Sequence, residues 1–274
     1  MRKVNSKCWD NWRKSAAGAG HWFRHQQAAV TLLATLLATL LALSGSTHAA
    51  EDFAACPQFF ANAKPPVVAP RPTNRALCYE AFAILHSGES KTPVFVAEKL
   101  NRASVADANE KRTNRFFADA RLRSAERATL EDYKNSGYDR GHMAPAGDMP
   151  TAQAMAQSFS LANMVPQAPE HNRGVWAKSV EMATRSYVKR AGGDVYVITG
   201  PVYVPSIAQS PGIGPGQVRV PKYLFKLVYD QSKNRAWAYW HGNADATKAS
   251  RPISYGELVK RTGVEFLPGL RPGD

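Results

Sequence analysis

The stretch GYDRGHMAPAGDM, from Gly137 to Met149, places a single histidine behind an aspartate, an arginine and a glycine. We expect its centre, Asp139–His142, to end a short strand, where side chains can meet a ligand. A glycine lets a bulky group approach the backbone, an arginine offers phosphate oxygens a planar fork, and neutral imidazole can accept a proton from water near neutral pH. A turn with a structural histidine is the alternative interpretation.

The segments around this stretch alternate between strand and helix patterns. Residues 172–193 form the clearest helix, because apolar residues recur at helical spacing, basic residues fill the last turn and two glycines follow. Its Trp176 is expected in the core. The mixture predicts the α+β class: a mixed, mainly antiparallel sheet core flanked by helices. Strands are predicted at 77–87, 92–100, 194–204, 222–230 and 235–242, and short helices at 125–133 and from Ser254. The aromatic residues of the last two strands are predicted to be core rather than a platform for bases.

The N-terminal 50 residues have the order of a signal peptide. A basic stretch precedes an uncharged apolar run at 28–43, and small residues follow it, so we expect cleavage near Ala49 or Ala50. The 16-residue run is shorter than the roughly 20 residues that span a bilayer, although an uncleaved anchor is the alternative. These features predict a signal peptide at 1–50, a single domain at 51–274, and a secreted or periplasmic product without membrane attachment.

Charge and cysteine content fit that division. Residues 51–274 keep 29 Lys and Arg against 21 Asp and Glu, a surplus of eight positive charges that favours a polyanionic partner. Cys56 and Cys78 are the two cysteines of this part, and we expect a disulfide between them. Two thiolates without a nearby histidine do not make a tetrahedral zinc site.

Three motifs carry a resemblance to a known family. DRGHMAPAGDM at 139–149, NMVPQAPEHNRGVW at 163–176 and DVYVITGPVY at 194–203 resemble the DNA/RNA non-specific endonucleases of the ββα-metal superfamily. The resemblance covers nearly all of residues 51–274. It implies a ββα-metal motif in the fold and a Mg²⁺-dependent endonuclease that cleaves DNA and RNA to 5′-phosphate products. Mn²⁺ is a possible substitute, and no obligate protein partner is implied.

The resemblance also assigns roles to individual residues. His142 would be the general base that activates water, and Arg140 would support the phosphate. Asn172 would be the one protein ligand of the metal, which suits magnesium because Mg²⁺ keeps much of its hydration. Asn163 would shape the site. Asn172 is also a suitable helix N-cap, and the two roles are compatible.

Two positions depart from a simple match. The family has an upstream arginine that contacts phosphate; Arg112 and Arg115 both fit, and Arg112 is preferred. The family also places a glutamate four residues after the helix tryptophan, where this chain has Val180 and carries Glu181 one residue later. A π-type bulge in the helix would turn Glu181 back towards Asn172. A regular helix with a solvated Glu181 is the alternative.

A second function class is compatible with the same fold. A non-catalytic nucleic-acid-binding or DNA-uptake protein would use the basic surface without a general base. The set of His142, Arg140 and Asn172 favours the enzyme, because a protein that only binds has no need of the base.

Overall fold

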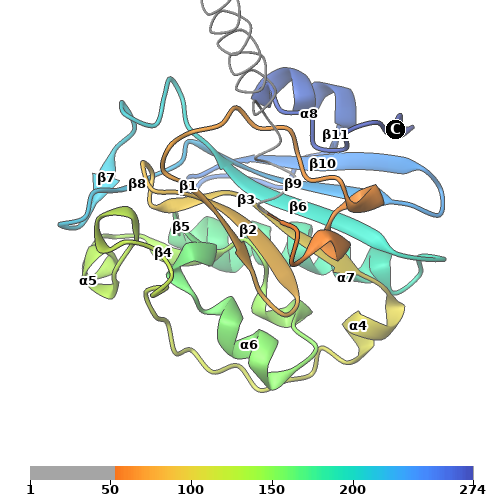
Figure 1. The fold of residues 1–274 in the computed structure, drawn as a ribbon, viewed down its shortest axis with the longest axis horizontal. Coiled ribbons are helices and arrows are strands. Elements are labelled where there is room, and N and C mark those ends of the chain that lie inside the picture. Colours follow the sequence, from red (N-terminus) through yellow and green to blue (C-terminus); the bar gives the residue numbers. More distant parts are fainter. Residues whose placement is uncertain (1–52, 274) are drawn as a thin grey trace, which may run out of the picture. The chain divides into compact units, whose positions relative to one another are not determined.

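A computed structural model describes residues 53–273. The predicted signal peptide at 1–50 lies outside these residues. A seven-stranded sheet runs in the order β1-β2-β3-β6-β9-β10-β11, and every neighbouring pair in it is antiparallel (Figure 1). The prediction of an α+β fold with a mainly antiparallel core is confirmed. The strands are β1 (Asn74–Cys78), β2 (Phe82–Ser87), β3 (Thr92–Leu100), β6 (Val195–Val202), β9 (Tyr223–Asp230), β10 (Arg235–Gly242) and β11 (Ile253–Ser254).

Helices cover both faces of this sheet. In Figure 1, α8 lies on one side, and α4, α6 and α7 lie on the other. The helices are α4 (Arg102–Ala106), α5 (Leu130–Tyr133), α6 (Ala152–Ser158), α7 (Met182–Val188) and α8 (Tyr255–Thr262), with a π-helix, η7 (His171–Glu181), directly before α7. None of the helices within 53–273 is long and apolar enough to span a membrane. Short 3-10 turns lie at η2 (Pro57–Phe59), η3 (Ala61–Ala63), η4 (Ser124–Glu126), η5 (Ala146–Asp148) and η6 (Leu161–Asn163).

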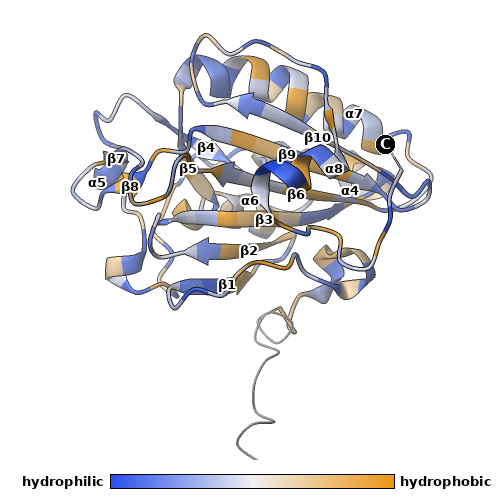
Figure 2. Ribbon diagram, turned by 90° about the horizontal axis from the view of Figure 1, so that it is seen from above, coloured by the Kyte–Doolittle hydropathy of each residue, from blue (hydrophilic) through white to orange (hydrophobic). Residues whose placement is uncertain are grey.

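The alternation of side chains along each strand divides the core in two. On β2, Ala83 and Leu85 belong to a cluster that includes Leu258 of α8, whereas Phe82 and Ile84 face a cluster built around Trp176. Successive strand residues point to opposite faces, which produces this division. Figure 2 shows hydrophobic residues along the central strands of the sheet. Residues of the first two motifs, among them Met143, Val165 and Trp176, pack on this side of the sheet, which supports them from below.

Two smaller strand pairs complete the fold. Strands β4 (Asp139–His142) and β5 (Met164–Gln167) pair antiparallel, and η7 follows β5 after three residues, which gives the strand–strand–helix order expected of a ββα motif. Strands β7 (Gly212–Ile213) and β8 (Val218–Arg219) form a separate pair. The sequence did not predict α6, and the run predicted at 77–87 contains the end of β1, a turn and β2.

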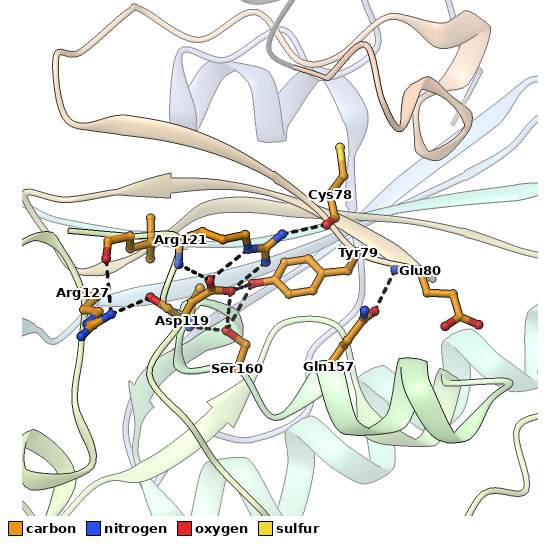
Figure 3. A network of polar contacts seen from close by, with 10 residues as sticks. Cys78, Tyr79, Glu80, Asp119, Arg121, Arg127, Gln157 and Ser160 are labelled. Carbon is orange, nitrogen blue, oxygen red and sulfur yellow. Dashed lines mark hydrogen bonds and ion pairs between the residues drawn. The ribbon is translucent and has the colours of Figure 1, made fainter. Parts of the chain in front are cut away.

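A buried carboxylate anchors the long segment between α4 and β4. Asp119 accepts hydrogen bonds from Tyr79 Oη at 2.6 Å and from Arg121 Nη2 at 2.7 Å, and Ser160 lies in the same network (Figure 3). Burial alone would raise the pKa of Asp119, but the hydrogen bonds from Arg121 and Tyr79 lower it to about 2. Phe117, two residues earlier, bridges to Ser160. The segment is therefore held in place although it contains little regular structure.

The predicted disulfide is present. Cys56 and Cys78 are bonded, with their Cα atoms 5.8 Å apart, and Cys56 belongs to the buried cluster on the α8 side of the sheet. The bond ties the start of the described chain to the end of β1.

Candidate active site

The pairing of β4 with β5 brings the first two motifs side by side. His142 lies opposite Met164, and Gly141 lies opposite Val165. A Cβ on Gly141 would collide with the side chain of Gln167. Close packing against Gln167 therefore requires a glycine at position 141. The sequence had suggested only that this glycine lets a ligand approach the backbone.

The helix after β5 has π geometry. The segment His171–Glu181 is a π-helix, and the Met182 N–H bonds to the Ala177 carbonyl, an i→i+5 contact. Nine residues separate Asn172 from Glu181, which is about two and a half turns of an α-helix and would place them on opposite sides. Bonding from i to i+5 widens each turn by close to one residue, so the nine residues make roughly two turns. The predicted bulge is confirmed, and it extends over eleven residues rather than a single turn.

One cleft of about 350 Å³ gathers most of the predicted residues. Arg112, Arg140, His142, Asn172 and Glu181 all line it. Arg115 does not, so the geometry separates the two candidate upstream arginines. Arg173 and Arg185 also line the cleft, but each forms an ion pair, with Asp139 and Asp148 respectively, so Arg112 and Arg140 supply its unpaired positive charge among the described residues.

Asn163 lies behind the cleft rather than in its wall. Its side chain is fully buried, accepts from Ala144 N at 2.9 Å and donates to the carbonyl oxygens of Ala144 and Ser158, each at 2.9 Å. Its own carbonyl accepts from Met143 N at 3.0 Å. These hydrogen bonds hold the backbone that follows His142 in place. Asn163 therefore supports the site by bonding to backbone atoms and not by lining the cleft.

His142 is buried and neutral at ordinary pH. Burial, followed by the positive charges of Arg112 and Arg140, lowers its pKa to about 3. Its Nε2 has no hydrogen-bond partner among the described residues. The imidazole packs edge-on against Phe159, with centroids 5.0 Å apart, and lies 5.8 Å from the ring of Phe116. The ring is thus held by aromatic contacts, and the one nitrogen of the neutral imidazole that carries no proton is its acceptor, with a basicity that burial and the two arginines lower.

The guanidinium groups of Arg112 and Arg140 pack against the same two phenylalanines. The Arg140 guanidinium lies 4.0 Å from the Phe116 centroid, and the Arg112 guanidinium lies 5.0 Å from that of Phe159. Phe116 and Phe159 themselves meet edge to face at 4.9 Å. Neither was recognised from the sequence, because each is one aromatic residue in a stretch without periodicity. Cation–π contacts of this kind stabilise a guanidinium in place without using its hydrogen-bond donors. Arg112 Nε donates to Asn114 Oδ1 at 2.7 Å, so its two terminal nitrogens are the donors left for phosphate.

Asn172 is oriented by the motif itself. Its Nδ2 donates to Asp139 Oδ2 at 2.9 Å, and Arg173 Nε donates to the same oxygen at 2.8 Å. A carboxylate only accepts, so the amide nitrogen faces Asp139 and the Asn172 carbonyl oxygen is left for the cleft. An oriented amide oxygen is a ligand that Mg²⁺ accepts, and the ion tolerates a site with one protein ligand because it retains water. No cluster of three or more His, Cys, Asp or Glu residues suited to a metal occurs within 53–273, so a fully enclosed metal cage is not available there.

A buried ionic cluster lies beneath the cleft. Lys226 of β9 is 1% exposed, and its Nζ donates to Thr199 Oγ1 at 2.6 Å and to the carbonyl of Met143 at 3.3 Å. Glu98 of β3 is fully buried, and neither of its carboxylate oxygens has a hydrogen-bond partner in the described part of the chain. Burial, reinforced by Asp148, raises the pKa of Glu98 well above its usual value. Sequence reasoning missed both residues, since each reads as a polar position on an otherwise apolar strand.

The structure also places several neighbours of the cleft. Trp176 is fully buried, as predicted. His171 and His241 are buried and lie 3.2 Å apart from Nε2 to Nδ1. Asp148 lies in η5 and forms an ion pair with Arg185 at 2.9 Å.

The motifs, the pairing of their strands and the cleft agree with a match to a known family. The model of the DNA/RNA non-specific endonucleases matches residues 65–272. This chain belongs to that family. The family resemblance inferred from the three motifs is thereby confirmed.

Individual relatives show how similar the sequences are and how much of each chain the similarity covers. The mitochondrial nuclease EXOG of Xenopus laevis is 35% identical over 209 residues, which cover 70% of this chain and 58% of the relative. Nuclease C1 of Cunninghamella echinulata var. echinulata is 35% identical over 203 residues, covering 70% of this chain and 79% of the relative. The chain thus spans less than two thirds of the length of EXOG.

A solved structure agrees with the fold. A chain in the crystal structure of the EndoG/EndoGI complex, described as showing the mechanism of EndoG inhibition, has a TM-score of 0.64 and 26% identity, covering 72% of this chain and 86% of that chain.

The relatives correct one prediction. The sequence predicted a secreted or periplasmic protein, but EXOG, human endonuclease G and the Saccharomyces cerevisiae mitochondrial nuclease are all named as mitochondrial. These names point to mitochondria rather than to secretion, so the predicted location is wrong. The inference rested on the order of residues in 1–50, and a basic stretch before an apolar run does not by itself distinguish destinations.

Proposed function

We propose that this chain is a divalent-metal-dependent endonuclease that hydrolyses phosphodiester bonds in DNA and RNA without sequence preference, with residues 51–274 as its single nuclease domain. The observation that carries the proposal is the cleft in which His142, Asn172, Arg140, Arg112 and Glu181 converge. Membership of the family supports it. The alternative of a non-catalytic binder is set aside, because the cleft supplies a neutral base that binding alone does not need.

The proposed mechanism begins with His142. As a neutral imidazole it takes a proton from a water molecule, whose oxygen attacks phosphorus. The P–O3′ bond breaks, and the departing O3′ takes a proton from a solvent water, which leaves a 3′-hydroxyl on one fragment and a 5′-phosphate on the other; His142 then returns its proton to solvent. Arg140 and Arg112 hold the phosphate oxygens and offset the charge that develops on them. Their aromatic supports keep both guanidiniums in position before substrate binds.

Asn172 and Glu181 would hold the metal side of the site. The carbonyl oxygen of Asn172, fixed by Asp139, would be the direct ligand of Mg²⁺, and Mn²⁺ would fit the same oxygen. Glu181 would orient water in the metal's hydration shell. When bound, the divalent ion stabilises negative charge on the phosphate and on the leaving oxygen.

Incubation with plasmid DNA and with RNA tests the proposal, in Mg²⁺ and in chelator. We expect chelator to stop cleavage of both. His142→Ala should remove most turnover and retain binding, because affinity comes mainly from phosphate contacts. Undiminished cleavage by His142→Ala would refute the mechanism.

A matched pair of arginine variants tests the phosphate contacts. Arg112→Ala should weaken catalysis. Arg115→Ala changes the same charge three residues away, outside the cleft, and should not. Equal losses in both variants would show that general charge, rather than placement in the cleft, explains the effect.

A further inference from the structure

A second groove, of about 630 Å³, opens on the opposite face of α7 from the cleft. Ala183 and Tyr187 of α7 line this groove, whereas Arg185 of the same helix lines the catalytic cleft. We call it the arginine–aromatic groove, after its principal residues. They are Tyr187, Arg190, Arg235, Trp237, Arg251 and Ile253.

Aromatic rings form the floor of this groove. Tyr187 meets Trp237 edge to face, with centroids 4.7 Å apart, and both side chains are half-buried. The Tyr187 hydroxyl donates to Asp230 Oδ2, which fixes the ring. The sequence predicted that the aromatic residues of β10 belong to the core. Trp237 corrects this in part, because it is half-buried: it packs on the edge of a core cluster, on β10 between β9 and the short strand β11, and its ring contacts Tyr187 of α7.

The charge around the rings is uniformly positive. Arg190, Arg235 and Arg251 are exposed, and none of the three has a carboxylate ion pair or a side-chain hydrogen bond among the described residues. The Arg235 guanidinium lies 6.0 Å from the Trp237 centroid. Asp230, the acidic residue bonded to Tyr187, is fully buried and also accepts from Ser232. Burial would raise the pKa of Asp230, but the hydrogen bonds from Ser232 and Tyr187 lower it, so the carboxylate is ionised with its oxygens bonded to these two hydroxyls beneath the floor of the groove.

A half-buried aromatic floor surrounded by unpaired guanidiniums suits one kind of ligand. Bases stack on aromatic rings irrespective of their sequence, and guanidiniums bind the phosphates on either side. The three arginines come from three segments: the turn after α7, the start of β10 and the loop before β11. Their spread along the groove suits a chain of phosphates better than a single one.

We propose that the arginine–aromatic groove is an exosite for a single-stranded segment of polynucleotide, with a base on Trp237 and phosphates on Arg190, Arg235 and Arg251. The inference rests on the proposed function, since it supplies a second contact to the same substrate class. A single-stranded segment is required because paired bases expose no ring face for stacking. The exosite adds affinity for long substrates and leaves the chemistry in the cleft untouched.

Two sets of variants test the groove. The first replaces Arg190, Arg235 and Arg251 together with alanine, and Trp237→Ala and Trp237→Phe address the ring. The matched control replaces Lys64, Arg71 and Arg123 with alanine, which removes the same charge from exposed positions that line neither the groove nor the cleft.

Binding of a labelled single-stranded DNA 20-mer in chelator gives the first readout. We expect the groove triple variant to weaken binding about tenfold or more and Trp237→Ala about fivefold, with Trp237→Phe close to wild type. The slope of log affinity against log salt should fall by roughly 2, since each lost single-strand phosphate contact removes about 0.7. An unchanged affinity, or an equal loss in the control triple variant, overturns the proposal.

Cleavage in Mg²⁺ separates this proposal from the proposed function. The groove variants should raise KM for long RNA and leave kcat, as well as cleavage of a tetranucleotide, unchanged. Loss of tetranucleotide cleavage in the groove variants would contradict an exosite and assign the groove to the catalytic machinery. A wild-type chain that binds the 20-mer in the groove but cleaves nothing would refute the proposed function alone.

Two further measurements distinguish an exosite from a groove that binds a free nucleotide or a second copy of this chain. If 5′-AMP displaces the 20-mer from wild type at micromolar concentration and loses that ability in the groove variants, the groove binds free nucleotides and the exosite is refuted. If sedimentation shows that the groove triple variant changes the oligomeric state, the surface is a contact between copies of this chain, which also refutes it. A wild-type sedimentation profile and weak 5′-AMP competition are the results expected for an exosite.

Discussion

Asp139 holds the side chain of Asn172: the amide nitrogen of Asn172 lies 2.9 Å from Asp139 Oδ2, and Arg173 secures the same carboxylate. The strand of the first motif therefore orients the amide oxygen that the proposed metal needs. This contact also explains why an aspartate precedes the arginine and histidine of the motif. The Asp139 carboxylate thus orients Asn172, whereas Arg140 is proposed to contact the phosphate.

We expect Asp139→Ala to lower the apparent affinity for Mg²⁺ by about 10- to 100-fold, because residues that orient a metal ligand have effects of this size. The Mg²⁺ concentration that gives half-maximal cleavage measures it. Asp139→Asn keeps one acceptor oxygen and should lose less. Asp107→Ala, an exposed aspartate outside the cleft, is the control. A Mg²⁺ titration of Asp139→Ala that overlays wild type would contradict the role.

The π-helix leads to a second prediction. Deletion of the exposed Lys178 shortens the spacing from Asn172 to Glu181 to eight residues, about two and a quarter turns of a regular helix. We expect the deletion variant to fold with an α-helical ladder and to retain cleavage within about tenfold of wild type. Insertion of one alanine after Lys178 should instead abolish cleavage, because it turns Glu181 away. Loss of activity in the deletion variant equal to that of Glu181→Ala would refute this account of the helix.

Glu98 gives a prediction about stability at higher pH. Its folded pKa is raised by burial, so the folded protein keeps a proton that the unfolded chain releases. Stability contributed in this way is present below the unfolded pKa and declines as pH rises towards the folded pKa. We expect Glu98→Gln to remove that decline and to be at least as stable as wild type at pH 7 to 8. Urea unfolding at several pH values measures this, and a steeper decline in the variant would contradict it.

His86 gives the corresponding prediction at lower pH. It is fully buried, its Nε2 lies 2.8 Å from the Glu126 carbonyl, and burial lowers its pKa to about 4. Between pH 6.5 and 4 the unfolded chain binds a proton that the folded protein does not, so stability falls as pH is lowered through this range and is unaffected above it. The total contribution is about 3 kcal/mol. His86→Gln should show a smaller loss over the same range in urea unfolding, and an identical loss would assign the pH dependence to other groups.

Some parts of the site were predictable from the sequence because they are local. The order aspartate, arginine, glycine, histidine lies within four residues, and the spacing of Glu181 from Trp176 departs from the family's by a single residue. That one-residue difference was enough to predict π geometry, because the position of a residue along a helix sets the direction in which its side chain points. The strands and the disulfide were predictable for the same reason: alternation and the small number of cysteines are properties of the sequence itself.

Other parts were not predictable because they depend on segments that are distant along the chain. Arg112 was preferred over Arg115 on the sequence, but its support was not predictable: it lies over Phe159, which meets Phe116 from 43 residues away in sequence at 4.9 Å between ring centroids. The contact of Lys226 with the Met143 carbonyl joins β9 to the residue after His142. Such contacts leave no periodic pattern in the sequence, because each one joins just two residues.

The sequence by itself determined the family, most of the sheet strands and the helix after the second motif, and it proposed the residues for phosphodiester hydrolysis. Only the tertiary structure decided which side chains share the cleft, which charges are buried beneath it and which aromatic ring remains at the surface. The physical reason is that residue type and short-range spacing fix what a side chain can do and which way it points. Its pKa, its hydrogen-bond partners and its exposure are set by neighbours that folding brings from elsewhere in the chain.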